Sequence, residues 1–466
     1  MAATLPATGV LGQDARSVQK SVPTGKKRSL LFLNDNPANY EKLMESIRSI
    51  KEFEFPILPI KIDYQKPQEI AQSIQGKDAD LIVTVLPRVT LNAGNMATAF
   101  ADLDVPLILL PVNLDLIMLE ADLCAAVRAK GGNAMLANSE KDLIELIKIA
   151  AAPRILEGKK ALIFGRPFDS SSVPARNLSA DYIYKRTGVR LQYRPIEDLK
   201  PLLEGITDAS AQKEMERWKK EAVKVVEPSD KAILDECRLY VLLRSIVEKE
   251  GLSAISIDCL NFSFNANPIL PLPCLSFTRL RDEGIAAPCE ADVCASLSSM
   301  FLQEISRKPS YFCNVSEVHA EKSSAVLRHC VAPTKLLGAE APALPYNLRD
   351  YHGMGRGAVP EVEFPVGLEI TMGGFSKDLK EFVLWPGRTI ARVKDTDTPS
   401  FPGVKMRKFC SNHLEAKIKD VDSFLQKIAG CHHIMVAGSY TKAIRKAMLR
   451  MGIRTIEPAD STAPEA

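Results

Sequence analysis

The sequence predicts two α/β domains, each with a doubly wound parallel sheet, followed by a β-rich, barrel-like C-terminal domain. From residue 28 to about residue 150, short apolar runs alternate with segments of helical period, which is typical of a parallel sheet covered by helices on both faces. The same alternation restarts after Pro153. After about residue 340, frequent prolines separate short β-rich runs at hairpin spacing, which favours antiparallel strands.

The first α/β domain is predicted over residues 26–153. Its strands are expected at 29–34, 56–62, 80–86, 105–111 and 134–137, with helices at 40–50, 67–74, 93–103, 114–129 and 141–151. No glycine-rich phosphate loop follows the first strand, so nucleotide binding is not expected. Residues 1–25 lack the apolar core of a signal peptide and are predicted to be a disordered tail, as are residues 459–466.

The second α/β domain is predicted over residues 154–340 and the C-terminal domain over 341–458. Expected strands in the second domain are 160–165, 190–193 and 254–260, with helices at 211–225, 230–250 and 290–305. In the C-terminal domain we expect strands at 366–372, 381–384 and 389–393, and helices at 421–427 and 441–451.

Composition excludes several classes of protein. The 466 residues include 60 basic and 57 acidic side chains, and the net charge of +3 argues against a nucleic-acid surface. No run of about 18 apolar residues occurs, so no membrane span is expected. The ten cysteines are irregularly spaced, which favours reduced thiols in a cytoplasmic protein over a disulfide framework.

The six histidines all lie between His319 and His433. Imidazole is a common ligand of transition metals and a frequent acid or base at neutral pH, so the chemistry is expected in this part of the chain. Chance and packing are the alternative explanation. The neighbouring residues favour function, because Cys289-Glu290, His329-Cys330 and Cys431-His432-His433 bring further ligand types close in sequence.

Three of these segments are candidates for a shared site. Glu290 opens a predicted helix, where an acid also complements the helix dipole. His329 follows an apolar patch, so a strand end could present it, although a hydrogen-bonded core histidine is the alternative. In the pair His432-His433 the two rings should project to opposite faces of a strand, one to a cleft and one to the sheet. A glutamate and two histidines would suit a divalent cation of borderline hardness.

These pieces, in this order, resemble the L-fucose isomerase and L-arabinose isomerase superfamily over about residues 254–455. The matching motifs are Cys289–Asp292 opening a helix, Phe312–Asn314 ending a strand, and the turn from His329 to Pro333. Further matches are the glycine segment Tyr346–Val359, the strand Val366–Met372, and His432-His433 before an apolar strand and Gly438.

The resemblance implies an aldose–ketose isomerase that works through an enediol, with a divalent metal, expected to be Mn²⁺, as cofactor. It implies a small sugar as substrate and a homo-oligomer with the active site near a subunit interface. By position, Glu290 corresponds to a carboxylate that binds the metal and carries protons, and His329 and His433 to further metal ligands. His352, Arg356 and His432 are expected to contact the substrate.

One position departs from the family pattern. Asn314 stands where the second catalytic carboxylate is expected, and an amide cannot act as a base at neutral pH. Glu317 is the candidate to replace it, with Asp292 and His319 as weaker candidates. A sugar-binding protein without turnover, or a lyase or epimerase acting on a sugar derivative, is therefore the alternative to an isomerase. A purely structural α/β assembly protein would form no cleft around these segments.

Overall fold

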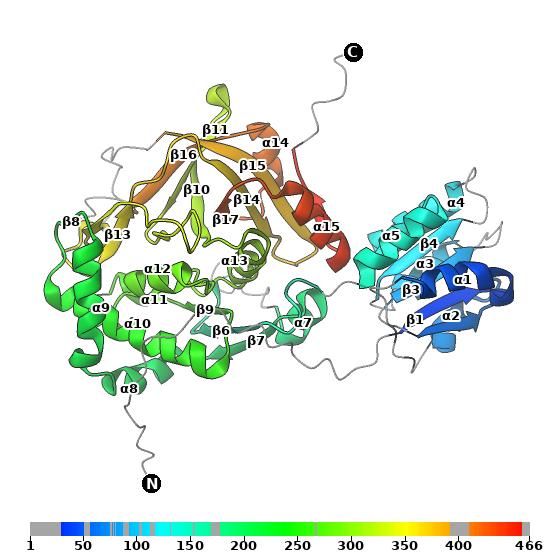
Figure 1. The fold of residues 1–466 in the computed structure, drawn as a ribbon, viewed down its shortest axis with the longest axis horizontal. Helices are drawn as coiled ribbons and strands as arrows, with labels where there is room; N and C mark the ends of the chain where they lie inside the picture. The colour runs from blue at the N-terminus through cyan, green and yellow to red at the C-terminus, as the bar shows by residue number, and fades with distance from the viewer. Residues whose placement is uncertain are drawn as a thin grey trace, which may run out of the picture.

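The predicted α/β class with a β-barrel is confirmed by a computed structural model of the chain (Figure 1). The structure describes residues 29–50, 56–74, 77, 79, 81–86, 93–101, 105–111, 117–130, 132–151, 154–168, 178–265, 268–391 and 410–458. Both predicted tails, residues 1–25 and 459–466, lie outside this part of the chain.

The N-terminal unit is a five-stranded parallel sheet with the order β2-β1-β3-β4-β5. The strands are β1 (Leu30–Asn34), β2 (Ile57–Lys61), β3 (Leu81–Leu86), β4 (Leu107–Pro111) and β5 (Ala134–Leu136). The helices are α1 (Glu41–Arg48), α2 (Pro67–Ile74), α3 (Ala93–Ala101), α4 (Met118–Ala129) and α5 (Glu140–Ala151). Separate apolar cores lie on the two faces of the sheet, which explains why its inner strands β1, β3 and β4 are almost entirely apolar.

The second unit is built on a three-stranded parallel sheet with the order β7-β6-β9. Its strands are β6 (Lys160–Phe164), β7 (Arg190–Arg194) and β9 (Ala254–Ile257). Its helices are α7 (Ala180–Thr187), α8 (Leu199–Glu204), α9 (Asp208–Glu221), α10 (Asp230–Glu250), α11 (Leu260–Ser263), α12 (Cys274–Asp282) and α13 (Val293–Ser306). Strands β7 and β9 flank β6 on opposite sides, so the strand order reverses at β6. The carboxyl ends of the strands at such a reversal are where α/β proteins commonly bind ligands.

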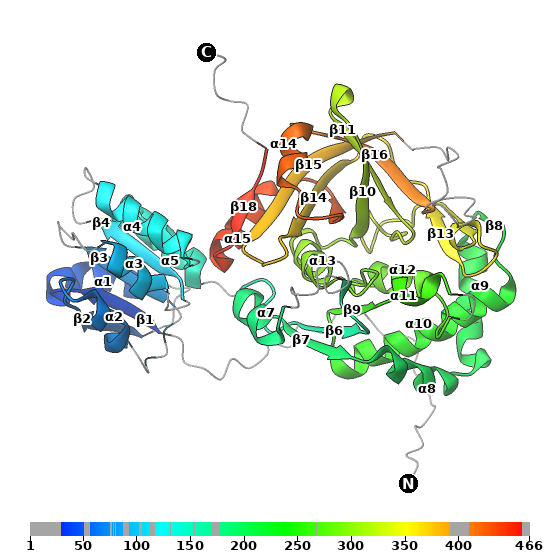
Figure 2. The same ribbon diagram turned by 180° about the vertical axis from the view of Figure 1, so that it is seen from behind.

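The C-terminal unit is a closed six-stranded antiparallel barrel with the order β14-β17-β10-β11-β16-β15, closed by the pairing of β14 with β15. The strands are β10 (Tyr311–His319), β11 (Ser324–His329), β14 (Glu369–Phe375), β15 (Glu381–Ala391), β16 (Asn412–Ile418) and β17 (His432–Ala437). Strand β18 (Arg454–Ile456) adds to β15 in parallel, and α14 (Val421–Lys427) and α15 (Thr441–Met451) accompany the barrel (Figure 2).

A small sheet completes the fold. Strands β12 (Tyr346–Arg349) and β13 (Val359–Val362) pair antiparallel, and β8 (Lys224–Val225) joins β12 in parallel. Within the described residues, no helix is long and apolar enough to cross a membrane.

Several expected boundaries differ from the structure. Strand β10 does not end at Asn314 but continues to His319. Strands β10 and β11 are part of the barrel, although the barrel-like domain was expected to begin only at residue 341. The two strands expected at 381–384 and 389–393 are one long strand, β15. Helix α13 begins at Val293 rather than Glu290, because Glu290 and Ala291 have positive φ angles. The carboxylate of Asp292 caps α13 instead.

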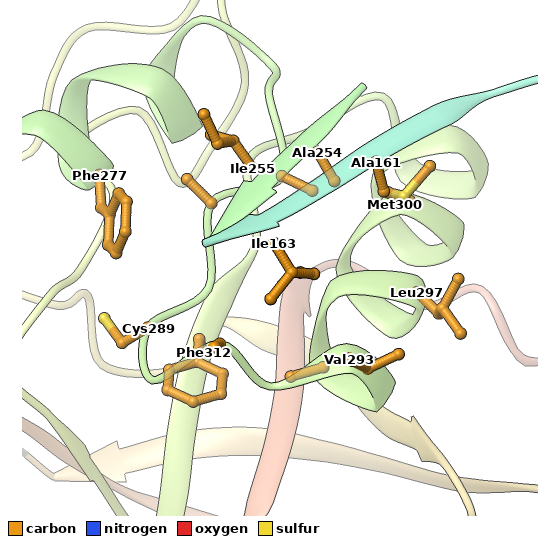
Figure 3. Packing of buried hydrophobic residues seen from close by; sticks show 14 of the residues in the cluster. Ala161, Ile163, Ala254, Ile255, Phe277, Cys289, Val293, Leu297, Met300 and Phe312 are labelled. Atoms are coloured by element: carbon orange, nitrogen blue, oxygen red, sulfur yellow. The ribbon is translucent and has the colours of Figure 1, made fainter. Parts of the chain in front are cut away.

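Helix α13 joins the second unit to the barrel. One apolar core includes Ile163 and Ile255 from the parallel sheet, Val293 and Met300 from α13, and Phe312 from the outer face of the barrel. Figure 3 shows these side chains together, with Cys289 and Phe312 at one edge of the cluster. This edge carries the candidate functional site. The barrel interior holds a second core, with α9 and α10 packed against it.

Candidate active site

Glu290, His329 and His432 meet where the second unit contacts the outside of the barrel. The Nε2 atom of His329 lies 3.4 Å from Oε1 of Glu290, and Nε2 of His432 lies 3.4 Å from Oε2. One ligand atom from each residue lies within 4.8 Å of the others. The cluster is secluded, because the Glu290 side chain is 15% exposed and each histidine side chain is 3% exposed.

The backbone that presents Glu290 has an unusual conformation. Glu290 and Ala291 have φ angles of 67° and 53°, in the left-handed region that costs a non-glycine residue roughly 1–3 kcal/mol. The chain is held there by two bonds near the end of β9: the N–H of Ala291 donates to the carbonyl of Ile257 at 3.1 Å, and the N–H of Glu290 points to Sγ of Cys259 at 3.4 Å. Such strain is common at functional sites.

Asp292 orients His432. One oxygen, Oδ1, accepts the N–H of Ala295 at 2.7 Å and so caps α13. The other oxygen, Oδ2, lies 2.8 Å from Nδ1 of His432 and accepts its proton. With the proton fixed on Nδ1, Nε2 is the nitrogen that faces Glu290. This is the arrangement in which a carboxylate prepares a histidine to bind a metal. Lys377 adds a positive charge 3.8 Å from Oδ2.

Aromatic rings form the walls of the cluster. The ring of Phe312 lies 4.4 Å from that of His329 and 4.5 Å from that of His432, measured between centroids. Phe168, just after β6, lies 4.6 Å from the His432 ring, and its N–H donates to the carbonyl of Ala291 at 3.3 Å. These rings restrict water and so strengthen the electrostatic interactions among the polar groups.

The electrostatics of the cluster favour its charged forms. Burial opposes the charge on each group, but the neighbours outweigh it. Cys289 and Glu290 raise the pKa of His329 to about 9, and Asp292, with Cys431 and Glu290, raises the pKa of His432 to about 10. The two histidines in turn hold the pKa of Glu290 below its usual value, and His432 and Lys377 lower that of Asp292 to about 2.

His433 is the expected metal ligand of the pair, but the structure brings His432 to Glu290 instead. The two rings do project to opposite faces of β17, but His432 is the one that joins Glu290. His433 lies on the face of the barrel interior, where its ring is 5.5 Å from that of Phe424 and has no side-chain hydrogen-bond partner among the described residues. Burial lowers its pKa to about 4, which keeps this ring neutral.

Asn314 lies next to the cluster, whereas Glu317 does not. Asn314 on β10 is directly paired with His432 on β17, and directly paired side chains in antiparallel strands share a face. Glu317 lies beyond a bulge in β10, where it forms an ion pair with Arg328 and lies 3.7 Å from Nε2 of His319. The structure therefore gives no support to Glu317 or His319 as a replacement for the second carboxylate.

The contacts of His352 and Arg356 are with residues other than Glu290. His352 belongs to a second group of ligand-type residues with Cys330 and Cys410. The guanidinium of Arg356 donates to the carbonyls of Ser263 and Asn265, and so ties its loop to the end of α11.

A cavity of about 480 Å³ opens at the carboxyl ends of β6, β7 and β9. Its polar lining includes Arg166, Glu197, Asp258 and Asn261. Asp258 is buried, and burial raises its pKa although Asn261 and the N–H of Arg166 bond its oxygen. Asp258 directly precedes Cys259, the residue that contacts Glu290, so the cavity and the cluster share one loop.

Sequence reasoning missed two contributors to the site, Lys377 and Phe168, and underrated Asp292. Nothing in the sequence near Lys377 or Phe168 distinguishes them from surface residues. Asp292 did give a signal, because an aspartate three residues before an alanine in an apolar helix is typical of an N-cap. Its second oxygen is then free to bind another group.

Comparisons with known proteins find only partial similarity. The chain is 24% identical over 120 residues to sulfoquinovose isomerases of Priestia aryabhattai and Priestia megaterium, which is 26% of this chain and 26% of each relative. It is 29% identical over 100 residues to a sulfoquinovose isomerase of Alkalicoccus urumqiensis, 21% of this chain and 22% of the relative. The matches thus span about a quarter of the length of these curated relatives.

No protein-family model matches the chain. Among solved structures, an acetyl-coenzyme A synthetase 1 of Ca. Korarchaeum cryptofilum in its apo form aligns with a TM-score of 0.23 and 12% identity, over 59% of this chain and 64% of that one. A score this low gives no support to a shared fold.

Proposed function

We propose that this protein is an aldose–ketose isomerase of a small sugar, and that it uses a divalent cation, Mn²⁺ in our proposal, held by Glu290, His329 and His432. The observation that carries the proposal is the secluded group of one carboxylate and two imidazoles between the α/β unit and the barrel. The partial similarity to proteins named sulfoquinovose isomerases supports a sugar isomerase.

The residues of the cluster fit a cation. Two ligand atoms that each lie roughly 2.1 Å from a metal, at angles between 90° and tetrahedral, are about 3.0–3.5 Å apart. Both distances from Glu290 oxygens to histidine nitrogens, 3.4 Å, fall in this range. One carboxylate with two imidazoles suits first-row divalent metals and leaves positions open for substrate.

In the proposed reaction a proton moves between C1 and C2 of the sugar through an enediol. A bound cation would withdraw electron density from the two neighbouring substrate oxygens and so acidify the carbon-bound proton. Glu290, with its lowered pKa, is unprotonated at neutral pH and can take up a proton. Asp292 holds His432 in place, and Phe312 and Phe168 exclude water.

The cavity that shares the Asp258-Cys259 loop with the cluster supports a sugar substrate. Its volume of about 480 Å³ exceeds that of a monosaccharide, and the side chains of Asp258, Asn261 and Glu197 offer hydrogen-bond partners for hydroxyl groups. We also propose that the protein is a homo-oligomer with its active site near a subunit interface, as the resemblance to sugar isomerases implies. Light scattering measures this directly, and a monomer would contradict it.

The test compares Glu290→Gln with Glu317→Gln. With Mn²⁺ and a panel of pentoses, hexoses and their 6-deoxy and 6-sulfonated derivatives, ketose formation and uptake of solvent deuterium at C2 are followed. We expect Glu290→Gln to lower turnover by about 100- to 10,000-fold, the usual contribution of an acid or base. Glu317→Gln should act like the wild type. Equal activity of both variants, or loss only in Glu317→Gln, would overturn the proposed role of Glu290.

A second candidate function, sugar binding without turnover, is favoured by one observation. Asn314 lies beside His432 at the position where a second proton-carrying carboxylate is expected. If the protein binds a sugar but exchanges no C2 hydrogen with solvent, this alternative replaces the isomerase.

A further inference from the structure

A second group of ligand-type side chains, formed by Cys330, His352 and Cys410, has no role in the proposed reaction. Cys330 follows the last residue of β11, His352 lies in the turn Tyr351–Gly353, and Cys410 precedes β16. The Sγ atom of Cys330 lies 3.8 Å from Sγ of Cys410 and 3.1 Å from Nε2 of His352. Two sulfurs and an imidazole at these distances could hold a soft metal or act as a reactive pair of thiols.

The orientation of the His352 ring favours a reactive pair of thiols over a metal site. Histidines that bind metals almost always donate the proton of their other ring nitrogen to an acceptor. In His352 that other nitrogen, Nδ1, instead accepts the backbone N–H of Cys410 at 3.0 Å. The ring proton must therefore be on Nε2, where it points at the sulfur of Cys330. A metal could bind Nε2 only if the ring lost this proton, while Nδ1 is already engaged as the acceptor of the Cys410 N–H.

The backbone around the pair is strained and firmly held. Cys410 and His352 have φ angles of 37° and 54°, both in the left-handed region. The N–H of Cys410 is fixed by His352, and the carbonyl of Cys330 accepts Nδ2 of Asn412 at 2.7 Å. The two sulfurs are thus held in contact by other groups. Cys330 is partly exposed, whereas Cys410 is 5% exposed, so a reagent would reach Cys330 first.

We infer that Cys330 and Cys410 form a reversible disulfide by exchange with a small-molecule disulfide such as oxidised glutathione. The sulfur of Cys330 attacks one glutathione sulfur, the glutathione S–S bond breaks, and one glutathione leaves as a thiol. The sulfur of Cys410 then attacks Cys330, and the second glutathione leaves. The two protein thiols lose two electrons and two protons, which appear in two molecules of reduced glutathione.

The inference is independent of the proposed isomerase, so its test needs no sugar. The full-length protein is reduced, freed of reductant and incubated with oxidised glutathione. Free thiols are then blocked, and unreduced peptides are examined by mass spectrometry. We expect a peptide that joins Cys330 to Cys410, and its loss after treatment with dithiothreitol. Absence of this linked peptide, or stable glutathione on Cys330 in the wild type, would overturn the inference.

Variants separate the two steps of the exchange. Cys410→Ser should accumulate glutathione on Cys330, because the second attack is removed, and Cys330→Ser should form neither product. His352→Phe should slow the first step about tenfold, the value of one hydrogen bond to the sulfur. Cys431→Ser changes the exposed cysteine outside the pair and should form the linked peptide as the wild type does. If one equivalent of Zn²⁺ instead protects both thiols in the reduced wild type, the group is a metal site and the disulfide inference is wrong.

Discussion

The two faces of the strand pair β10–β17 differ sharply although their residues alternate along the same strands. On the face toward the second unit, His432 bonds Asp292, approaches Glu290 and lies beside Asn314. On the barrel interior, the adjacent His433 lies against Phe424 with no side-chain partner among the described residues. The pKa of a buried histidine depends on the acids that face it. His432 and His433 are adjacent in sequence, yet the pKa is about 10 for His432 and about 4 for His433.

The strongest test of this difference removes each of the two adjacent imidazole rings in turn. We expect His432→Ala to weaken Mn²⁺ binding by more than about 100-fold, because loss of a partner that merely orients a ligand already costs about 10- to 100-fold. His433→Leu should bind Mn²⁺ as the wild type does. Isothermal titration measures both affinities. Similar losses in the two variants would mean that the two faces do not differ in this way.

Asp292→Asn should have the next largest effect. An asparagine can still cap α13, but its amide cannot accept the His432 proton with the strength of a carboxylate. We expect Mn²⁺ affinity to fall about 10- to 100-fold while the helix content stays unchanged. Circular dichroism supplies the control, and unchanged affinity would contradict the orienting role of Asp292.

Lowering the pH should decrease the stability of the folded protein through His433, which lies on the barrel interior. The pKa of His433 in the folded protein, about 4, lies below the ordinary value of 6.5, so the folded state binds fewer protons than the unfolded state. Its contribution to stability is therefore fully present above about pH 6.5 and is lost as the pH falls toward 4. From pH 7.5 to 5 the loss is about 2 kcal/mol.

His433→Leu should lack this part of the acid sensitivity. The measurement is the free energy of unfolding in urea at both pH values, for the wild type and the variant. His432 has the opposite sign: its raised pKa stabilises the folded state below about pH 6.5, and this contribution is lost as the pH rises through about 10. Equal acid sensitivity of the wild type and His433→Leu would show that His433 is not held neutral.

Asn314→Asp should have the smallest effect and the opposite direction. It places a carboxylate beside His432, where a second proton carrier is expected, and we expect isomerase turnover to rise about tenfold. Val315→Asp, one residue along β10 and on the other face of the strand, is the matched control and should give no gain. A fall in turnover with Asn314→Asp would indicate that the neutral amide is itself required.

The sequence was sufficient to predict the α/β class, to select Glu290 as a member of the candidate site, and to place His329 at a strand end. It could not show which of His432 and His433 lies beside Glu290. Both faces of β17 are buried, and the apolar residues that follow the two histidines do not distinguish one face from the other. Nor could the sequence show that β10 continues past Asn314, because the residues that follow pair with β11 around a bulge between Val315 and Glu317, which breaks the regular alternation of a strand. The grouping of His352 with Cys330 and Cys410 depends equally on tertiary contacts.

Asp292 uses its two oxygens for two different purposes: one begins a helix and the other aims an imidazole. The first turn of α13 and the orientation of His432 consequently depend on the same carboxylate. Heat or denaturant that frays this helix end must also release the imidazole, so metal affinity and local helix order should be lost at the same temperature. Protection of the Ala295 amide against hydrogen exchange would then serve as a gauge of how often the site is assembled.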